Sequence, residues 1–80
     1  MNTITNYNGI DFTDFLSEMN DMYKSAAEAY HNGCMQKEQD CLTIAFGMKS
    51  AFLSLFGDKL DLRRTENITE HVIVEKNCSE

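Results

Sequence analysis

Residues 41–56 read CLTIAFGMKSAFLSLF and carry a single charge, that of Lys49. At the helical repeat of 3.6 residues, the apolar side chains of this run fill one broad face and spill onto both flanks. A helix that is apolar almost all round is usually buried. A chain of 80 residues has little other material to cover such a helix. The run therefore predicts a covering surface supplied by a second copy or by a partner protein.

A second amphipathic helix precedes this run. Apolar residues recur at steps of three and four between residues 12 and 31, Asp11 is placed as an N-cap, and Asn32-Gly33 ends the pattern. The connection to the next helix is short, so the two helices must run antiparallel. We expect one domain, 1–80, with helices at about 12–31 and 35–56. The predicted fold class is all-α, or mostly α: an antiparallel helical hairpin with short extended ends that dimerises into a four-helix bundle.

The two ends of the chain are less regular. Residues 1–9 predict an extended lead-in with a turn at Asn8-Gly9. The arm at 58–80 is ambiguous. Its β-branched run Val72-Ile73-Val74 favours a strand that could pair with residues 3–7. Asn67 and Glu70 resemble a helix-capping pair, which keeps a helix open as the alternative.

The charge balance restricts the class of partner. Thirteen acidic residues against seven basic ones give a net charge of −6. Direct binding to nucleic acid or to an anionic membrane surface is therefore not expected, whereas a basic protein would be attracted. Residues 1–7 lack the features of a signal peptide, and the run at 41–56 is shorter than a membrane span. These features predict a cytoplasmic protein.

Little in the sequence indicates catalysis or metal binding. His31, Cys34, Cys41, His71 and Cys78 could supply zinc ligands, but they lack the paired spacing typical of structural zinc sites. Cys34 beside His31 is the only candidate nucleophile, and no phosphate-binding or nucleophile-elbow motif is present. We therefore expect no enzymatic activity, no cofactor and no metal.

Two surfaces are candidates for binding a partner. On the longer helix, a strip of small residues at 43, 47, 50 and 54 is flanked by larger apolar side chains and would allow close approach of another helix. On the first helix, acidic side chains recur at steps of three and four on one side, with neighbours about 5–6 Å apart. The candidate residues are Phe46, Lys49, Ser50 and Leu53 on the longer helix, and Asp14, Glu18 and Asp21 on the first.

These observations favour a small acidic interaction protein, an inhibitor or adaptor of a larger macromolecule. By analogy, phages and mobile elements encode chains of this kind. The alternative is a DNA mimic whose acidic face occupies the basic groove of a nucleic-acid-binding protein. A membrane-surface helix at 41–56 is a third possibility, but its polar face lacks the lysines typical of such helices.

Overall fold

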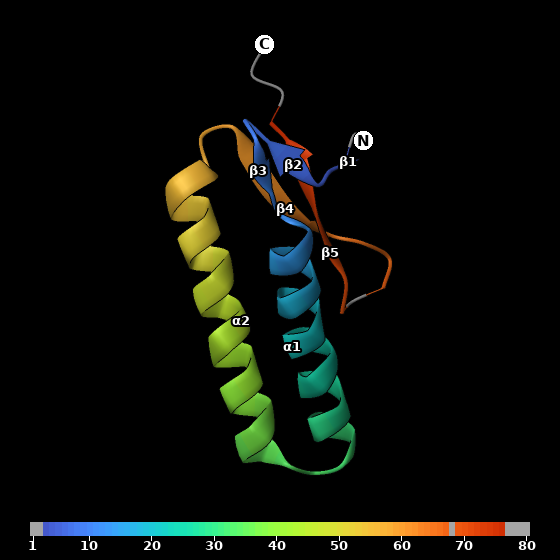
Figure 1. Ribbon diagram of the computed structural model, residues 1–80. Helices are drawn as coiled ribbons and strands as arrows, with labels where there is room; N and C mark the ends of the chain where they lie inside the picture. The colour runs from blue at the N-terminus through green and yellow to red at the C-terminus, as the bar shows by residue number, and fades with distance from the viewer. Residues whose placement is uncertain (1–2, 68, 77–80) are drawn as a thin grey trace.

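The computed structural model describes residues 3–67 and 69–76 and shows a mixed α+β fold (Figure 1). In chain order the elements are β1 (Thr3–Ile4), β2 (Asn6–Tyr7), β3 (Ile10–Asp11), α1 (Thr13–His31), α2 (Met35–Phe56), β4 (Leu60–Arg64) and β5 (His71–Glu75). The predicted all-α class is therefore wrong, because both ends of the chain form strands. The two helices are one layer of the fold and the strands are another.

Both helices follow their expected ranges, and local signals explain where α1 begins and ends. The N-cap is Phe12 and not Asp11 as predicted, and it makes no side-chain capping bond. Asp11, one residue earlier, accepts hydrogen bonds from the backbone N–H of Thr13 at 2.9 Å and from its hydroxyl at 2.7 Å. At the other end, Gly33 has a φ of +74°, its N–H donates to the Tyr30 carbonyl, and the Cys34 N–H donates to the Ala29 carbonyl. This pair of bonds is the Schellman motif, in which glycine is favoured because it adopts positive φ without strain. The predicted role of Gly33 is confirmed.

The strands of the two chain ends pair with each other. A three-stranded antiparallel sheet has the order β1-β5-β4, with Ile73 opposite Leu62 on one side and Ile4 on the other. The predicted pairing of the arm with the N-terminal segment is thus confirmed for Thr3 and Ile4, and the helical alternative for His71–Glu75 is wrong. A separate hairpin joins β2 to β3 through Asn8 and Gly9, which both have positive φ.

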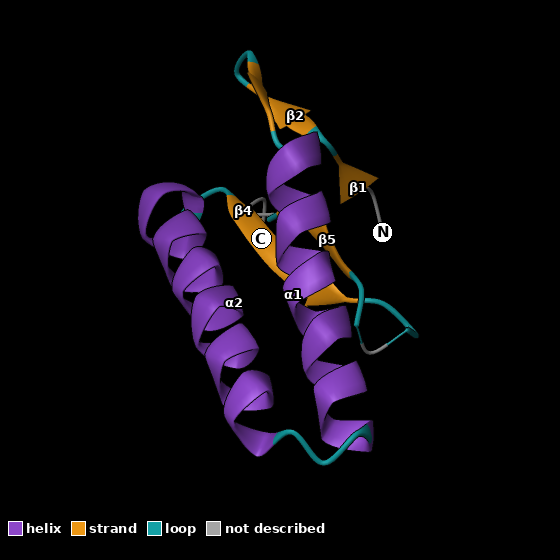
Figure 2. Cartoon of the chain, turned by 60° about the horizontal axis from the view of Figure 1, so that its bottom comes forward, coloured by secondary structure: helices purple, strands orange, loops and turns teal. Residues whose placement is uncertain are grey.

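The core lies between the helices and one face of this sheet. Figures 1 and 2 show both helices on the same side of the β1-β5-β4 sheet. Alternation along the strands turns the even-numbered residues of β4 and the odd-numbered residues of β5 toward the helices. The buried cluster comprises Phe12, Met19, Tyr23, Ala45, Phe52, Leu60, Leu62 and Ile73.

The first helix and this sheet together cover much of the apolar run at 41–56. Phe52 is buried, and Leu53 and Phe56 are partly buried and pack against the core cluster. The rings of Phe52 and Phe56 also make edge contacts with Phe12, at centroid distances of 5.2 and 5.1 Å. The predicted four-helix bundle is therefore wrong, because strands of the same chain supply the layer that a second hairpin was expected to supply.

The sheet covers only part of the helix layer. The molecule measures 45 × 23 × 21 Å, and the ends of α1 and α2 near their connection extend beyond the strands (Figure 1). The apolar periodicity of the helices continues into this projecting part, but no described strand packs against the side chains there. The first candidate site lies there.

Candidate docking surfaces

An apolar groove of about 500 Å³ lies between α1, α2 and the end of β4. Its aromatic walls are Tyr23, Tyr30 and Phe46, and its lining also contains the small or aliphatic residues Ala26, Ala27 and Leu42. We call this surface the aromatic groove. It forms because the apolar stripe of α1 continues past the point where the sheet ends.

The aromatic walls differ in how firmly they are held. Tyr23 is buried and stacks on the His71 ring with a centroid distance of 4.6 Å, so it is a fixed wall. Phe46 touches Tyr23 edge-on at 6.2 Å but is 53% exposed, and Tyr30 is 67% exposed. Two large rings therefore stand at the surface beside a hollow lined by small side chains. Contiguous exposed apolar surface of this kind marks interaction sites.

Charged side chains stand at the edge of the aromatic groove. Arg64 contributes an exposed guanidinium and Glu38 a half-buried carboxylate. Neither forms an ion pair within residues 3–67 and 69–76, where the salt bridge found joins Arg63 to Asp61 at 2.8 Å. The groove thus combines an apolar lining with one cation and one anion that remain available to a ligand.

His71 lies behind the groove and is 2% exposed. Its backbone is held by the side chain of Asn20, which accepts from the His71 N–H at 2.8 Å and donates to the His71 carbonyl at 3.2 Å. Its ring Nδ1 has no hydrogen-bond partner among the described residues. Burial lowers the pKa of His71 below the ordinary 6.5, and the positive charges of Arg64 and Lys49 lower it further. The folded state therefore favours the neutral imidazole.

This burial predicts a loss of stability in mild acid. Because the pKa of His71 is lower in the folded chain than in the unfolded chain, the neutral ring contributes fully above about pH 6.5. That contribution is lost as the pH falls through the lowered folded-state value. Urea unfolding is expected to give a smaller free energy at pH 5 than at pH 7. His71→Phe keeps a ring against Tyr23 and should flatten this dependence; an unchanged slope in the variant would assign it to other groups.

Of the residues predicted on the longer helix, only Phe46 lies in the aromatic groove. Leu53 is partly buried and packs against the core cluster, Lys49 is half-buried, and Ser50 is exposed. The four therefore do not form one surface. The strip of small residues faces outward, and a Cβ added at Gly47 would meet no atom within 4 Å. All four residues of that strip are exposed.

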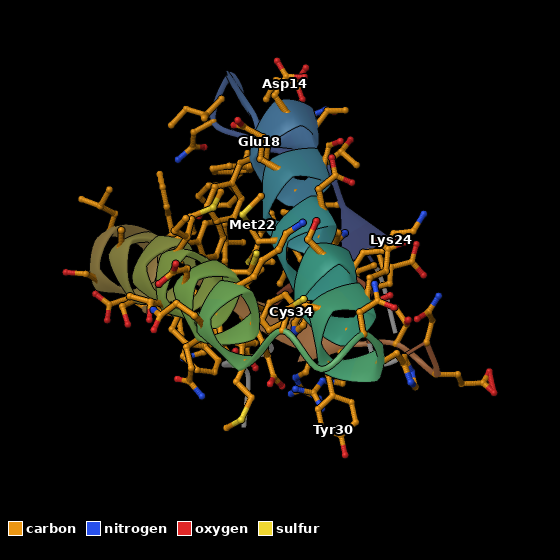
Figure 3. The ribbon with its side chains drawn as sticks, turned by 90° about the horizontal axis from the view of Figure 1, so that it is seen from below. Asp14, Glu18, Met22, Lys24, Tyr30 and Cys34 are labelled. Atoms are coloured by element: carbon orange, nitrogen blue, oxygen red, sulfur yellow. The ribbon has the colours of Figure 1, made fainter. Side chains whose placement is uncertain are left out.

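The predicted acidic residues Asp14, Glu18 and Asp21 are all exposed. At about 100° per residue, Asp14 and Glu18 lie roughly 160° and 120° around α1 from Tyr30, and Figure 3 shows them at the other end of the helix. They therefore lie on the other face of the helix layer from the aromatic groove. Glu18 and Asp21 border a second, smaller hollow of about 270 Å³.

Several groove residues were not recognised in the sequence. Tyr23 and Tyr30 belong to the regular apolar stripe of the first helix, and that stripe predicts core along its whole length. Arg64 belongs to the basic cluster Lys59, Arg63 and Arg64 of the arm, which was a possible partner site by itself but had no visible link to either helix. The missing information is where the sheet ends, because that boundary decides which part of the stripe is covered.

The residues considered for metal binding or catalysis do not converge. Within residues 3–67 and 69–76, no three His, Cys, Asp or Glu side chains are grouped as metal ligands would be. Cys34 is exposed and Cys41 is buried, both as free thiols, and Cys78 lies outside the described residues. Neither described helix has the length and apolar character needed to cross a bilayer.

Comparisons with protein-family models, with curated proteins and with solved structures found no significant match. Any function must therefore be inferred from the residues of these surfaces.

Proposed function

We propose that this chain is a small, acidic, non-enzymatic interaction protein that acts as an inhibitor or adaptor by docking a partner protein in the aromatic groove. The observation that carries the proposal is the exposed ring of Phe46 beside a hollow of about 500 Å³. Aromatic side chains next to a pocket dominate the binding energy of many interfaces. The groove also has room for an apolar side chain of the partner.

The charged edge supports a protein partner in particular. Arg64 and Glu38 carry opposite charges on the same groove, so a segment with both a carboxylate and a cationic group would be oriented by them. Free thiols at Cys34 and Cys41 agree with a reducing compartment, and the proposal includes a cytoplasmic location. A homodimer joined through the same groove is the simplest form of such docking.

Phe46→Ser is expected to weaken partner capture at least tenfold while leaving the fold intact, because the ring is more than half exposed. The measurement is quantitative pull-down from lysate of the source cells, after sedimentation has established whether the chain dimerises. Met35→Ser is the matched control: Met35 is also on α2, is 73% exposed and lies outside the groove lining. If both variants capture the partner equally, or if the unmodified chain captures none at micromolar concentration, the aromatic groove is not the docking site.

A DNA mimic remains the second candidate. It is supported by the exposure of Asp14, Glu18 and Asp21 on one side of α1 and by the net charge of −6. A mimic would bind through these carboxylates, so Phe46→Ser would leave capture unchanged and added salt would weaken it strongly. The same pull-down therefore separates the two candidates.

A further inference from the structure

A row of apolar side chains runs along the side of α2 that faces away from the sheet. Ile44, Met48, Ala51 and Leu55 follow one another at steps of four, three and four, which keeps them on one side of the helix. Ile44 is 52% exposed, Leu55 is 76% exposed and Ala51 is exposed as well, whereas Met48 is partly buried and packs against the core cluster. The row is about 16 Å long at the helical rise of about 1.5 Å per residue, or three turns.

Acidic side chains border this apolar row along α1. Glu18 and Asp21 line the hollow of about 270 Å³ together with Met22 of the same helix and with Ile44 and Met48 of α2. The hollow therefore has an apolar floor and an acidic edge. We call this surface the acid-edged strip; it comprises Glu18, Asp21, Met22, Ile44, Met48 and Leu55.

The negative charge extends beyond the hollow at both ends. Asp14 precedes Glu18 by one turn on α1 and projects from the same side in Figure 3, and Asp40 precedes Ile44 by one turn on α2. No ion pair within the described residues involves any of these carboxylates. Their charge is therefore available to a partner.

We propose that the acid-edged strip docks a cationic amphipathic helix of a partner protein. A three-turn apolar row matches the apolar side of a short helix, and the row of carboxylates beside it matches lysine or arginine on that helix's flank. Anionic nucleic acid and anionic lipid would be repelled by the same carboxylates. The basic groove of a nucleic-acid-binding protein would contact the carboxylates but would leave the apolar row exposed to water. The carboxylates and the apolar row together therefore favour an amphipathic helix as the partner.

This surface is separate from the aromatic groove. By helical spacing, Asp14 and Glu18 lie on a different side of α1 from Tyr30, and the two hollows share no lining residue. One chain could therefore hold two partners at once. That arrangement distinguishes an adaptor from a simple inhibitor.

The test uses a synthetic leucine–lysine amphipathic peptide of about 14 residues, or four helical turns, added to the full ¹⁵N-labelled chain. We expect amide shifts centred on Met22, Ile44 and Met48, and an affinity that falls as salt is added. The double variant Glu18→Lys with Asp21→Lys is expected to weaken binding at least tenfold. The matched control, Glu66→Lys with Glu70→Lys, makes the same charge change at exposed positions between β4 and β5, away from the strip, and should lose much less.

A second pair of measurements tests the apolar part. Ile44→Ser is expected to weaken binding at least tenfold, whereas Met35→Ser should not, and a leucine–glutamate peptide should not bind. The inference is overturned if both charge-reversed variants bind equally, or if the shifts map to Tyr30 and Phe46. In the second case the aromatic groove, and with it the proposed function, would still stand. Circular dichroism of each variant confirms that a lost affinity is not a lost fold.

Discussion

Replacing Ile73 with alanine is expected to lower the free energy of unfolding by about 2–5 kcal/mol. The Ile73 side chain has no exposed surface, and its strand pairs with Leu62 on one side and Ile4 on the other. Truncation removes apolar contacts and leaves a cavity between the sheet and the helices. The total free energy of unfolding of a small domain is only about 5–15 kcal/mol. Urea unfolding followed by circular dichroism should therefore show a clearly lower midpoint.

Val72→Ala is the control for this experiment. Val72 is the next residue of β5, is half-buried, and lies on the opposite face of the sheet, across from Arg63. Its truncation is expected to cost less than about 1 kcal/mol, because it leaves the helix–sheet core intact. Equal and small losses of unfolding free energy in the two variants would contradict the conclusion that the sheet covers the helices. They would instead favour a pair of helices covered by another molecule.

The helices were predictable because their signals are local. Apolar spacing identifies each helix, and the need for positive φ at Gly33 identifies the turn between them. Some strand signals were local as well. Leu60 and Leu62 alternate with Asp61 and Arg63, which is a two-residue period. The prediction did not use this alternation and left the arm at 58–80 ambiguous.

The β2–β3 hairpin also had a readable signal. Asn-Gly between two short extended segments is typical of a two-residue hairpin with positive φ at both positions, and Asn8 and Gly9 have φ of +52° and +81°. The predicted turn is confirmed, whereas the strands beside it were not predicted. Strands of two residues carry too little periodicity to be identified without their partners.

The position of the docking surfaces could not be read from the sequence, because it depends on long-range packing. Phe46 and Leu53 are equally apolar and lie on the same helix. Leu53 is partly buried and packs against the core cluster, whereas Phe46 is 53% exposed and lines the aromatic groove. The boundary between core and groove depends on strand pairing between residues 3–4 and 73–74, and a pairing between residues 69 to 71 positions apart has no local signal in the sequence.

Asn20→Ala is expected to destabilise the fold by about 1–3 kcal/mol, although the residue is a single polar side chain on a helix. Its amide accepts from the N–H of His71 and donates to the carbonyl of the same residue, both across 51 positions of sequence. On this edge of β5, β1 pairs only with Val74 and Ile73. The Asn20 side chain therefore acts as a substitute strand at His71, where backbone groups would otherwise be left without partners.

The size of this effect is informative because alanine is a better helix former than asparagine. If Asn20→Ala is less stable overall, the cost of losing the two hydrogen bonds to His71 must be larger than the gain in helix propensity. A net loss of stability therefore measures the contribution of these two bonds. Hydrogen exchange of the His71 amide is the more direct measurement and should become faster in the variant.

Two further variants are controls for this experiment. Asn20→Asp keeps an acceptor for the His71 N–H but places a carboxylate against the His71 carbonyl, so near neutral pH it should be as destabilising as alanine. Lys24→Ala, at an exposed position one turn along α1, should leave stability and exchange nearly unchanged. If Asn20→Ala behaves like Lys24→Ala, water replaces Asn20 as the hydrogen-bond partner of the His71 N–H and carbonyl. In that case only apolar contacts join α1 to β5.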